Sequence, residues 1–95
     1  MTQRKQFLSS ESLSSLSTAQ TLTIPPNCDY LELQPKTHDV WITFDGTTPS
    51  ASNGITYQKD GIFAHYVHPN NIIKAKESAA SGTLYINYFK INEAI

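Results

Sequence analysis

Short stretches in which apolar and polar residues alternate run through most of this chain. In residues 40–44, Val40, Ile42 and Phe44 alternate with Trp41 and Thr43, which is the period of a half-buried strand. Six further stretches have the same character: residues 20–24, 30–34, 55–58, 62–68, 72–76 and 83–90. Turn residues separate them every ~8–12 positions, which predicts an all-β fold, an antiparallel β-sandwich of jelly-roll or immunoglobulin-like type with about seven short strands.

Residues 72–81 (IIKAKESAAS) fit either of two structures. Their alanines and charged residues, with Asn71 before them and Gly82 after them, suit a short helix. Ile72 and Ile73 instead begin a β-like run, and the surrounding turns have strand-like spacing. We favour a strand over residues 72–76, followed by a loop to Gly82.

The stretch of residues 83–90 (TLYINYFK) has large apolar side chains on both faces. Leu84, Ile86 and Tyr88 share one face, and Tyr85 and Phe89 share the other. Such a strand lies in the middle of a sheet or has one face against a partner.

Residues 1–19 differ in composition from the rest of the chain. The run SSESLSSLS over residues 9–17 contains six serines, and serine is a poor residue for the interior of a helix. We therefore expect residues 1–19 to be a flexible or docking arm, with the sandwich domain over residues 20–95. The large apolar residues of this arm are candidates for contact with a neighbouring subunit: Phe7, Leu8, Leu13 and Leu16.

Composition excludes several classes of partner. Seven basic and eight acidic residues give a formal net charge of −1, so no basic excess points to nucleic acid. No apolar run approaches the ~18–20 residues that a membrane span requires. The single cysteine, Cys28, allows no internal disulfide, which suits synthesis in a reducing cytoplasm. Because a small domain without disulfides often gains stability by association, we expect the chain to assemble with copies of itself, as a homotrimer or on a repeating lattice.

No residue pattern indicates catalysis, a cofactor or a metal. His65 and His68 lie three apart in an expected strand, where such side chains point to opposite faces, so titrating surface histidines are the favoured interpretation. The alternative for Cys28 is a nucleophile with His38 as its base. The sequence therefore predicts a protein that is not an enzyme.

Several aromatic residues remain for a surface role. Trp41, Tyr66, Tyr85 and Phe89 are the candidates, and tyrosine and tryptophan are enriched where subunits meet. A platform that stacks against sugars is the alternative, formed by these four residues together with Tyr57, so carbohydrate is a second possible partner.

The loop sequence DGTTPSASNG over residues 45–54 has turn residues at both ends. Asp45, Gly46, Pro49 and Gly54 are its structural positions, since aspartate and glycine favour turns and proline cannot donate to a ladder. A D-G-T-x-P element after an aromatic strand resembles the C-terminal sandwich domain of chitobiases.

The wider layout of the chain resembles small virion structural proteins of tailed bacteriophages. The similarity spans residues 20–89 and includes the TLTIP opening, this loop and the TLYINYF ending. It implies a non-enzymatic capsid decoration protein, made in the host cytoplasm and located in the virion, that binds itself and the major capsid protein. The alternative is a carbohydrate-binding adhesion module of a phage tail or fibre.

Overall fold

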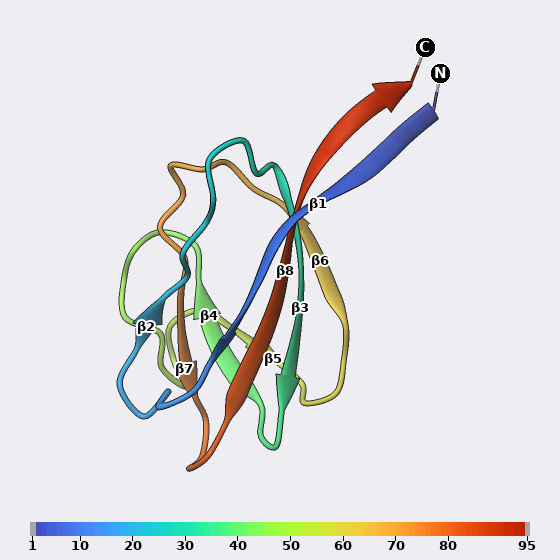
Figure 1. Cartoon of the computed structure of the whole chain (residues 1–95). Helices are drawn as coiled ribbons and strands as arrows, with labels where there is room; N and C mark the ends of the chain where they lie inside the picture. Colours follow the sequence, from blue (N-terminus) through green and yellow to red (C-terminus); the bar gives the residue numbers. More distant parts are fainter. Residues whose placement is uncertain (1, 95) are drawn as a thin grey trace.

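Two antiparallel sheets of four strands each pack face to face (Figure 1). In this computed structural model, residues 2–94 are described, with side chains for residues 4–92. Sheet A has the order β1 (Thr2–Leu13), β8 (Thr83–Ala94), β3 (Tyr30–Lys36), β6 (Phe63–Tyr66). Sheet B has the order β2 (Gln20–Thr21), β7 (Lys74–Glu77), β4 (Val40–Thr43), β5 (Ile55–Tyr57). The predicted all-β antiparallel sandwich is confirmed.

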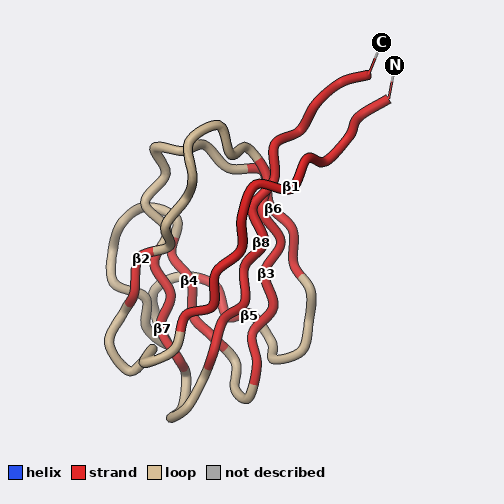
Figure 2. The backbone as a smooth tube through the Cα atoms, in the orientation of Figure 1, coloured by secondary structure: helices blue, strands red, loops and turns tan. Residues whose placement is uncertain are grey.

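The remainder of the described chain consists of turns and loops, drawn in tan in Figure 2. No helix among residues 2–94 is long and apolar enough to cross a membrane.

The core lies between the two sheets and is built from every second residue of their strands. In β3 the burial alternates strictly, because successive side chains of a strand point to opposite faces. Full burial of a large aliphatic or aromatic side chain stabilises the fold by about 1.5–3 kcal/mol. The largest fully buried apolar side chains are Tyr88, Leu16, Leu31, Leu33, Ile42, Ile73, Leu84, Ile86 and Val40.

The first residues of the chain belong to this sandwich, which corrects the prediction of a flexible arm. β1 pairs with β8 from Thr2 opposite Ala94 to Leu13 opposite Leu84. Leu16, which follows β1, is 0% exposed, and its carbonyl accepts a 2.9 Å hydrogen bond from the Glu77 amide. The expected domain boundary after residue 19 is therefore absent from the structure.

The segment over residues 72–81 forms a strand rather than a helix. β7 pairs with β2 on one side and β4 on the other, so its backbone groups are satisfied within sheet B. Ala75 points into the core, and the chain then turns through residues 78–82. The strand interpretation is confirmed, two residues later than expected at its start.

β1 and β8 are longer than the other strands and continue beyond the body of the sandwich as a two-stranded ribbon (Figure 1). This ribbon gives the molecule its long dimension, with extents of 46 × 24 × 19 Å. At its base the Asp29 carboxylate accepts a 2.7 Å hydrogen bond from the Ile91 amide and lies 3.2 Å from the Lys90 Nζ atom. Asp29, which directly precedes β3, thus accepts a hydrogen bond from a backbone amide of β8 at the base of the ribbon.

Candidate interaction surface

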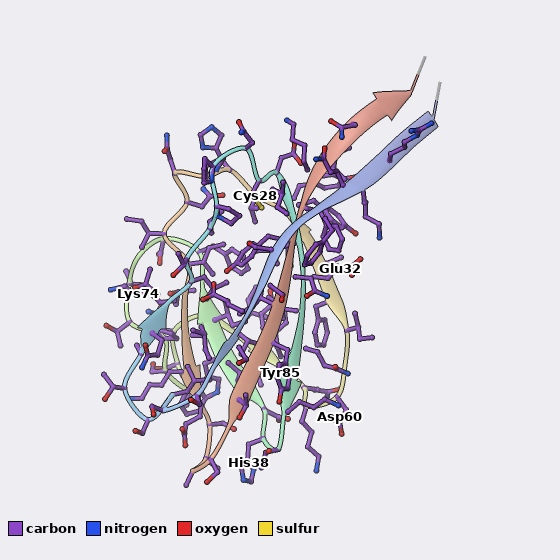
Figure 3. All side chains as sticks on the ribbon, in the orientation of Figure 1. Cys28, Glu32, His38, Asp60, Lys74 and Tyr85 are labelled. Carbon is purple, nitrogen blue, oxygen red and sulfur yellow. The ribbon has the colours of Figure 1, made fainter. Side chains whose placement is uncertain are left out.

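The residues considered for catalysis do not come together. Cys28 is fully buried with its Sγ 3.3 Å from the Tyr30 carbonyl oxygen, and Figure 3 places it at the opposite end of the sandwich from His38. His65 shares a 2.8 Å hydrogen bond with the Tyr57 hydroxyl, while His68 accepts one from the Asn70 amide. In the part of the chain that the structure describes, no group of three His, Cys, Asp or Glu side chains could hold a metal ion.

The outer face of sheet A carries a row of four aromatic rings, one from each strand. Phe7 of β1 lies opposite Phe89 of β8, Phe89 lies opposite Tyr30 of β3, and Tyr30 lies opposite Tyr66 of β6. The ring centroids are 6.0, 6.1 and 5.2 Å apart in that order, all with edge-to-face geometry. Each such pair contributes about 0.5–1.5 kcal/mol beyond its buried area. We call these four residues the aromatic row.

A lysine lies over the middle of the aromatic row. The Lys5 Nζ atom is 5.5 Å from the Tyr30 ring centroid and 5.4 Å from that of Phe89, which is cation–π distance. The same atom donates a 2.9 Å hydrogen bond to the Glu32 carboxylate, and this bond raises the pKa of Lys5. The ion pair balances the charge at this part of the surface.

The two end rings of the row are much more exposed than a packed aromatic side chain. Phe7 is 57% exposed and Tyr66 is 72% exposed, whereas Phe89 and Tyr30 are half-buried. The cause is their position, since β1 and β6 are the edge strands of sheet A and each end ring lacks a neighbour on one side. The row is therefore open at both edges of the sheet.

A shallow groove runs beside the aromatic row across the same strands. Its floor is a row of shorter side chains at the next outward position of β1, β8 and β3: Ser10, Asn87 and Glu32. Tyr85 and Ile62 stand on its far side, 48% and 72% exposed. Two adjoining hollows of about 360 and 130 Å³, which share Tyr85 and Asn87, make up this transverse groove.

The candidate interface residues lie on the outer face of sheet A, on sheet B and in the core. Phe7, Tyr66, Tyr85 and Phe89 share the outer face of sheet A. Trp41 is half-buried on β4 of the other sheet, opposite Thr56 and Lys76.

The three leucines proposed for docking point inward instead. Leu16 is fully buried, and Leu8 and Leu13 pack against the core, so their side chains are not available to a second subunit. Tyr30, which completes the aromatic row, was not among the candidates. Its outward position follows from the alternation of β3, but its neighbours depend on the order of strands in the sheet.

The loop over residues 45–54 is held by its own polar groups. Asp45 accepts hydrogen bonds from the hydroxyl and amide of Thr47 at 2.6 and 3.1 Å, and these bonds lower the pKa of Asp45. The Asn53 amide group donates to the Thr47 hydroxyl and the Thr48 carbonyl, both at 2.9 Å. Pro49 is buried beneath them. These contacts give the predicted turn residues a structural explanation.

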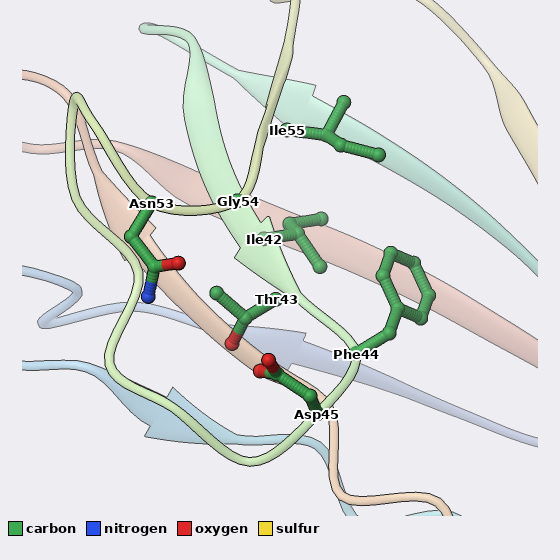
Figure 4. A pocket seen from close by; sticks show the side chains of 7 residues that line it. All are labelled: Ile42, Thr43, Phe44, Asp45, Asn53, Gly54 and Ile55. Carbon is green, nitrogen blue, oxygen red and sulfur yellow. The ribbon is translucent and has the colours of Figure 1, made fainter.

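Gly54 lies where the loop returns to sheet B. It has a φ of +106°, and a Cβ there would lie 2.6 Å from the Ile42 carbonyl oxygen, so only glycine fits. At Gly46, with a φ of +83°, a Cβ would make only an ordinary contact, 3.6 Å from the Ile72 side chain. Between the two ends of the loop is an open pocket of about 330 Å³, seen in Figure 4. The Asp45 carboxylate at its rim already accepts hydrogen bonds from Thr47, so this pocket offers no unused charged group to a ligand.

Two polar pairs lie behind the surface, inside the sandwich. The Tyr88 hydroxyl donates to the Glu11 carboxylate, which also accepts a 2.9 Å bond from the Thr23 amide, and burial raises the pKa of Tyr88. Burial likewise raises the pKa of Tyr57 and lowers that of its partner His65. Both pairs are satisfied internally, as buried polar groups need to be.

Comparisons with known proteins give no family. No protein-family model matches the chain, and no curated protein matches it. Among solved structures, a chain from the work titled "Bacillus endospore appendages form a novel family of disulfide-linked pili" is 19% identical with a TM-score of 0.49, and covers 92% of this chain and 91% of its own length. The resemblance to tailed-phage virion proteins stays a prediction.

Proposed function

We propose that this protein is a non-enzymatic structural subunit that joins its neighbours edge to edge through sheet A. The observation that carries the proposal is the aromatic row, whose end rings Phe7 and Tyr66 are exposed at the two open edges. The sequence resemblance supports a finer version, in which the assembled subunits decorate or cement a bacteriophage capsid.

The strand directions allow one copy to continue the sheet of the next. β1 is antiparallel to β8, β8 to β3 and β3 to β6, so β1 and β6 run in opposite directions. A second copy in the same orientation would therefore place its β1 antiparallel to β6 of the first. The unpaired backbone N–H and C=O groups of that β1 could then hydrogen-bond with those of β6, which is the usual mode of strand addition at an exposed edge.

The same contact would complete the aromatic row. Phe7 of one copy would lie beside Tyr66 of the next, and each ring would gain the neighbour that it lacks. Burying these rings is favourable at about 25 cal/mol per Å² of apolar surface. Because β6 has four residues, a single contact is weak, and stable association needs many copies or a second surface.

Such a contact is heterologous, because different surfaces of the two copies meet. Heterologous contacts give a closed ring where the rotation allows, such as the expected homotrimer, or an open array where it does not. A subunit that binds only an assembled shell also stabilises that shell by mass action, which is how a cementing protein works.

Association is tested with Phe7→Glu, which places a charge at the β1 end of the row. We expect the wild-type protein to gain mass with concentration in sedimentation velocity, and the variant to remain a monomer. Ile72→Glu is the matched control, because Ile72 is 54% exposed but lies outside sheet A. A wild-type protein that stays monomeric at high concentration, and binds no empty phage shells, would contradict the proposal.

A further inference from the structure

Beyond assembly, we propose that the transverse groove on sheet A binds a linear, uncharged glycan. The site is formed by Ser10, Glu32, Tyr85 and Asn87 between the aromatic row and Ile62. It differs from the sugar platform expected from the sequence, which relied on Trp41, because Trp41 lies on the other sheet.

The groove offers hydrogen-bonding groups that the protein does not use. Among the described residues, the side chains of Ser10, Tyr85 and Asn87 form no hydrogen bond with the rest of the chain. Asn87 brings both donors and an acceptor, and the two hydroxyls can act as either. Gln34 donates its amide to the Asp60 carbonyl at 3.0 Å, which holds it in place at the groove wall and leaves its oxygen available. A chain of sugar hydroxyls matches this mixture of donors and acceptors.

The charges in the lining favour an uncharged ligand over an anionic one. Two acidic residues belong to the strands at the groove: the Glu32 carboxylate is on the outer face, the Glu11 carboxylate points into the sandwich, and both already have partners. Glu32 is paired with Lys5 at 2.9 Å, and Glu11 accepts bonds from the Tyr88 hydroxyl and the Thr23 amide. No lysine, arginine or histidine is among the residues that line the two hollows, and Lys5, which lies over the aromatic row, is paired with Glu32. The lining therefore offers no free cation to a phosphate, sulfate or uronate. A charged polymer would therefore lose hydration without gaining an ion pair.

The shape of the groove favours a chain that crosses the strands. Its floor residues follow one another from β1 through β8 to β3, so the groove crosses these three strands of sheet A. Tyr85 of β8 stands on the far side of the groove at the point along its length where the two hollows adjoin, and the tyrosine ring can cover the apolar face of a sugar. Figure 3 shows Tyr85 and Glu32 on these neighbouring strands. Polar groups placed beside an aromatic face are the usual means of fixing a ligand's orientation.

The test is calorimetric titration of the full chain with cellohexaose, chitohexaose and mannohexaose, and with polygalacturonate as a charged probe. We expect at least one uncharged oligosaccharide to bind, and its affinity to fall by about tenfold or more in Tyr85→Ala and Asn87→Ala. Both positions face solvent on a strand that keeps its pairing, so both variants should fold, as checked by circular dichroism.

Tyr66→Glu is the matched control, since Tyr66 is an exposed tyrosine of the same sheet outside the groove lining. This variant should bind the sugar like the wild type even though it is designed to block assembly. Its binding therefore separates failure of this inference from failure of the proposed function. Absence of binding to all three uncharged probes would overturn the inference, as would a preference for polygalacturonate or binding unchanged in both groove variants.

Discussion

Leu16 provides a direct test of whether the serine-rich N-terminal segment belongs to the fold. Its side chain is 0% exposed within the core, and its carbonyl bonds to the Glu77 amide of β7. Leu16→Ala removes the buried methyl groups and leaves a cavity, which costs about 2–5 kcal/mol for a leucine in this environment. A domain of 95 residues has a free energy of unfolding of roughly 5–14 kcal/mol, so the loss would be a large share of it.

The assay is urea unfolding followed by the fluorescence of Trp41, the single tryptophan. We expect the midpoint of Leu16→Ala to fall with little change in slope, because the surface exposed on unfolding is nearly the same. In a thermal melt, a loss of about 3 kcal/mol would lower Tm by roughly 12–24 °C.

Ser17→Ala is the control, because Ser17 is exposed and next in the chain. Surface changes of this kind stay within about 0.5 kcal/mol. If Leu16→Ala unfolds at the same urea concentration as Ser17→Ala, the segment is a detached arm, and the structural account of residues 2–16 is refuted.

Three further tests concern the interior of the sandwich and the loop over residues 45–54, each by the same unfolding assay. Tyr88→Phe removes the donor to the Glu11 carboxylate and should cost about 1–3 kcal/mol; an unchanged midpoint would show that the bond contributes nothing. Gly46→Ala should lower the free energy of unfolding by the ~1–2 kcal/mol of left-handed backbone strain alone. Gly54→Ala should lower it further, because its new Cβ also meets the Ile42 carbonyl oxygen. Equal losses in the two variants would contradict this close approach. Burial lowers the pKa of His65 below its ordinary 6.5, so on acidification this imidazole is protonated in the unfolded chain before it is protonated in the folded one. The free energy of unfolding should therefore fall as the pH drops below about 6.5. His65→Gln should remove that part of the pH dependence, and a profile identical to that of the wild type would exclude His65 as its source.

The strands with regular alternation could be predicted from the sequence. β3, β4 and β8 each place an apolar residue at every second position, so the alternation alone identifies their inward faces. The strand at residues 74–77 was harder, because its alanine and lysines also suit a helix, and pairing with two neighbouring strands decides the matter.

β1 was missed for reasons that lie in its own residues. A bulge between Phe7 and Ser9 shifts the pairing by one residue, so the apolar residues no longer follow a period of two. Its inward positions also include Glu11, which is tolerated because Tyr88 and Thr23 supply hydrogen bonds. Only the partner strands show that these polar residues face the core.

The interaction surface depends on strand order in the same way. Phe7, Tyr30, Tyr66 and Phe89 are far apart in the sequence, and nothing local indicates that they form one row. Conversely, Trp41 and the leucines at positions 8, 13 and 16 have the right chemistry for an interface but lie elsewhere.

The most direct test of edge-to-edge assembly is a mixing experiment with Phe7→Glu and Tyr66→Glu. Each variant has one altered end of the aromatic row and one native end, so each alone should be a monomer in sedimentation velocity. In an equimolar mixture the native Tyr66 end of the first can meet the native Phe7 end of the second. Because this single contact is weak, we predict 1:1 heterodimers whose fraction rises with protein concentration and that grow no further. Variants that assemble like the wild type when alone, or a mixture that stays monomeric while the wild type assembles, would contradict this contact.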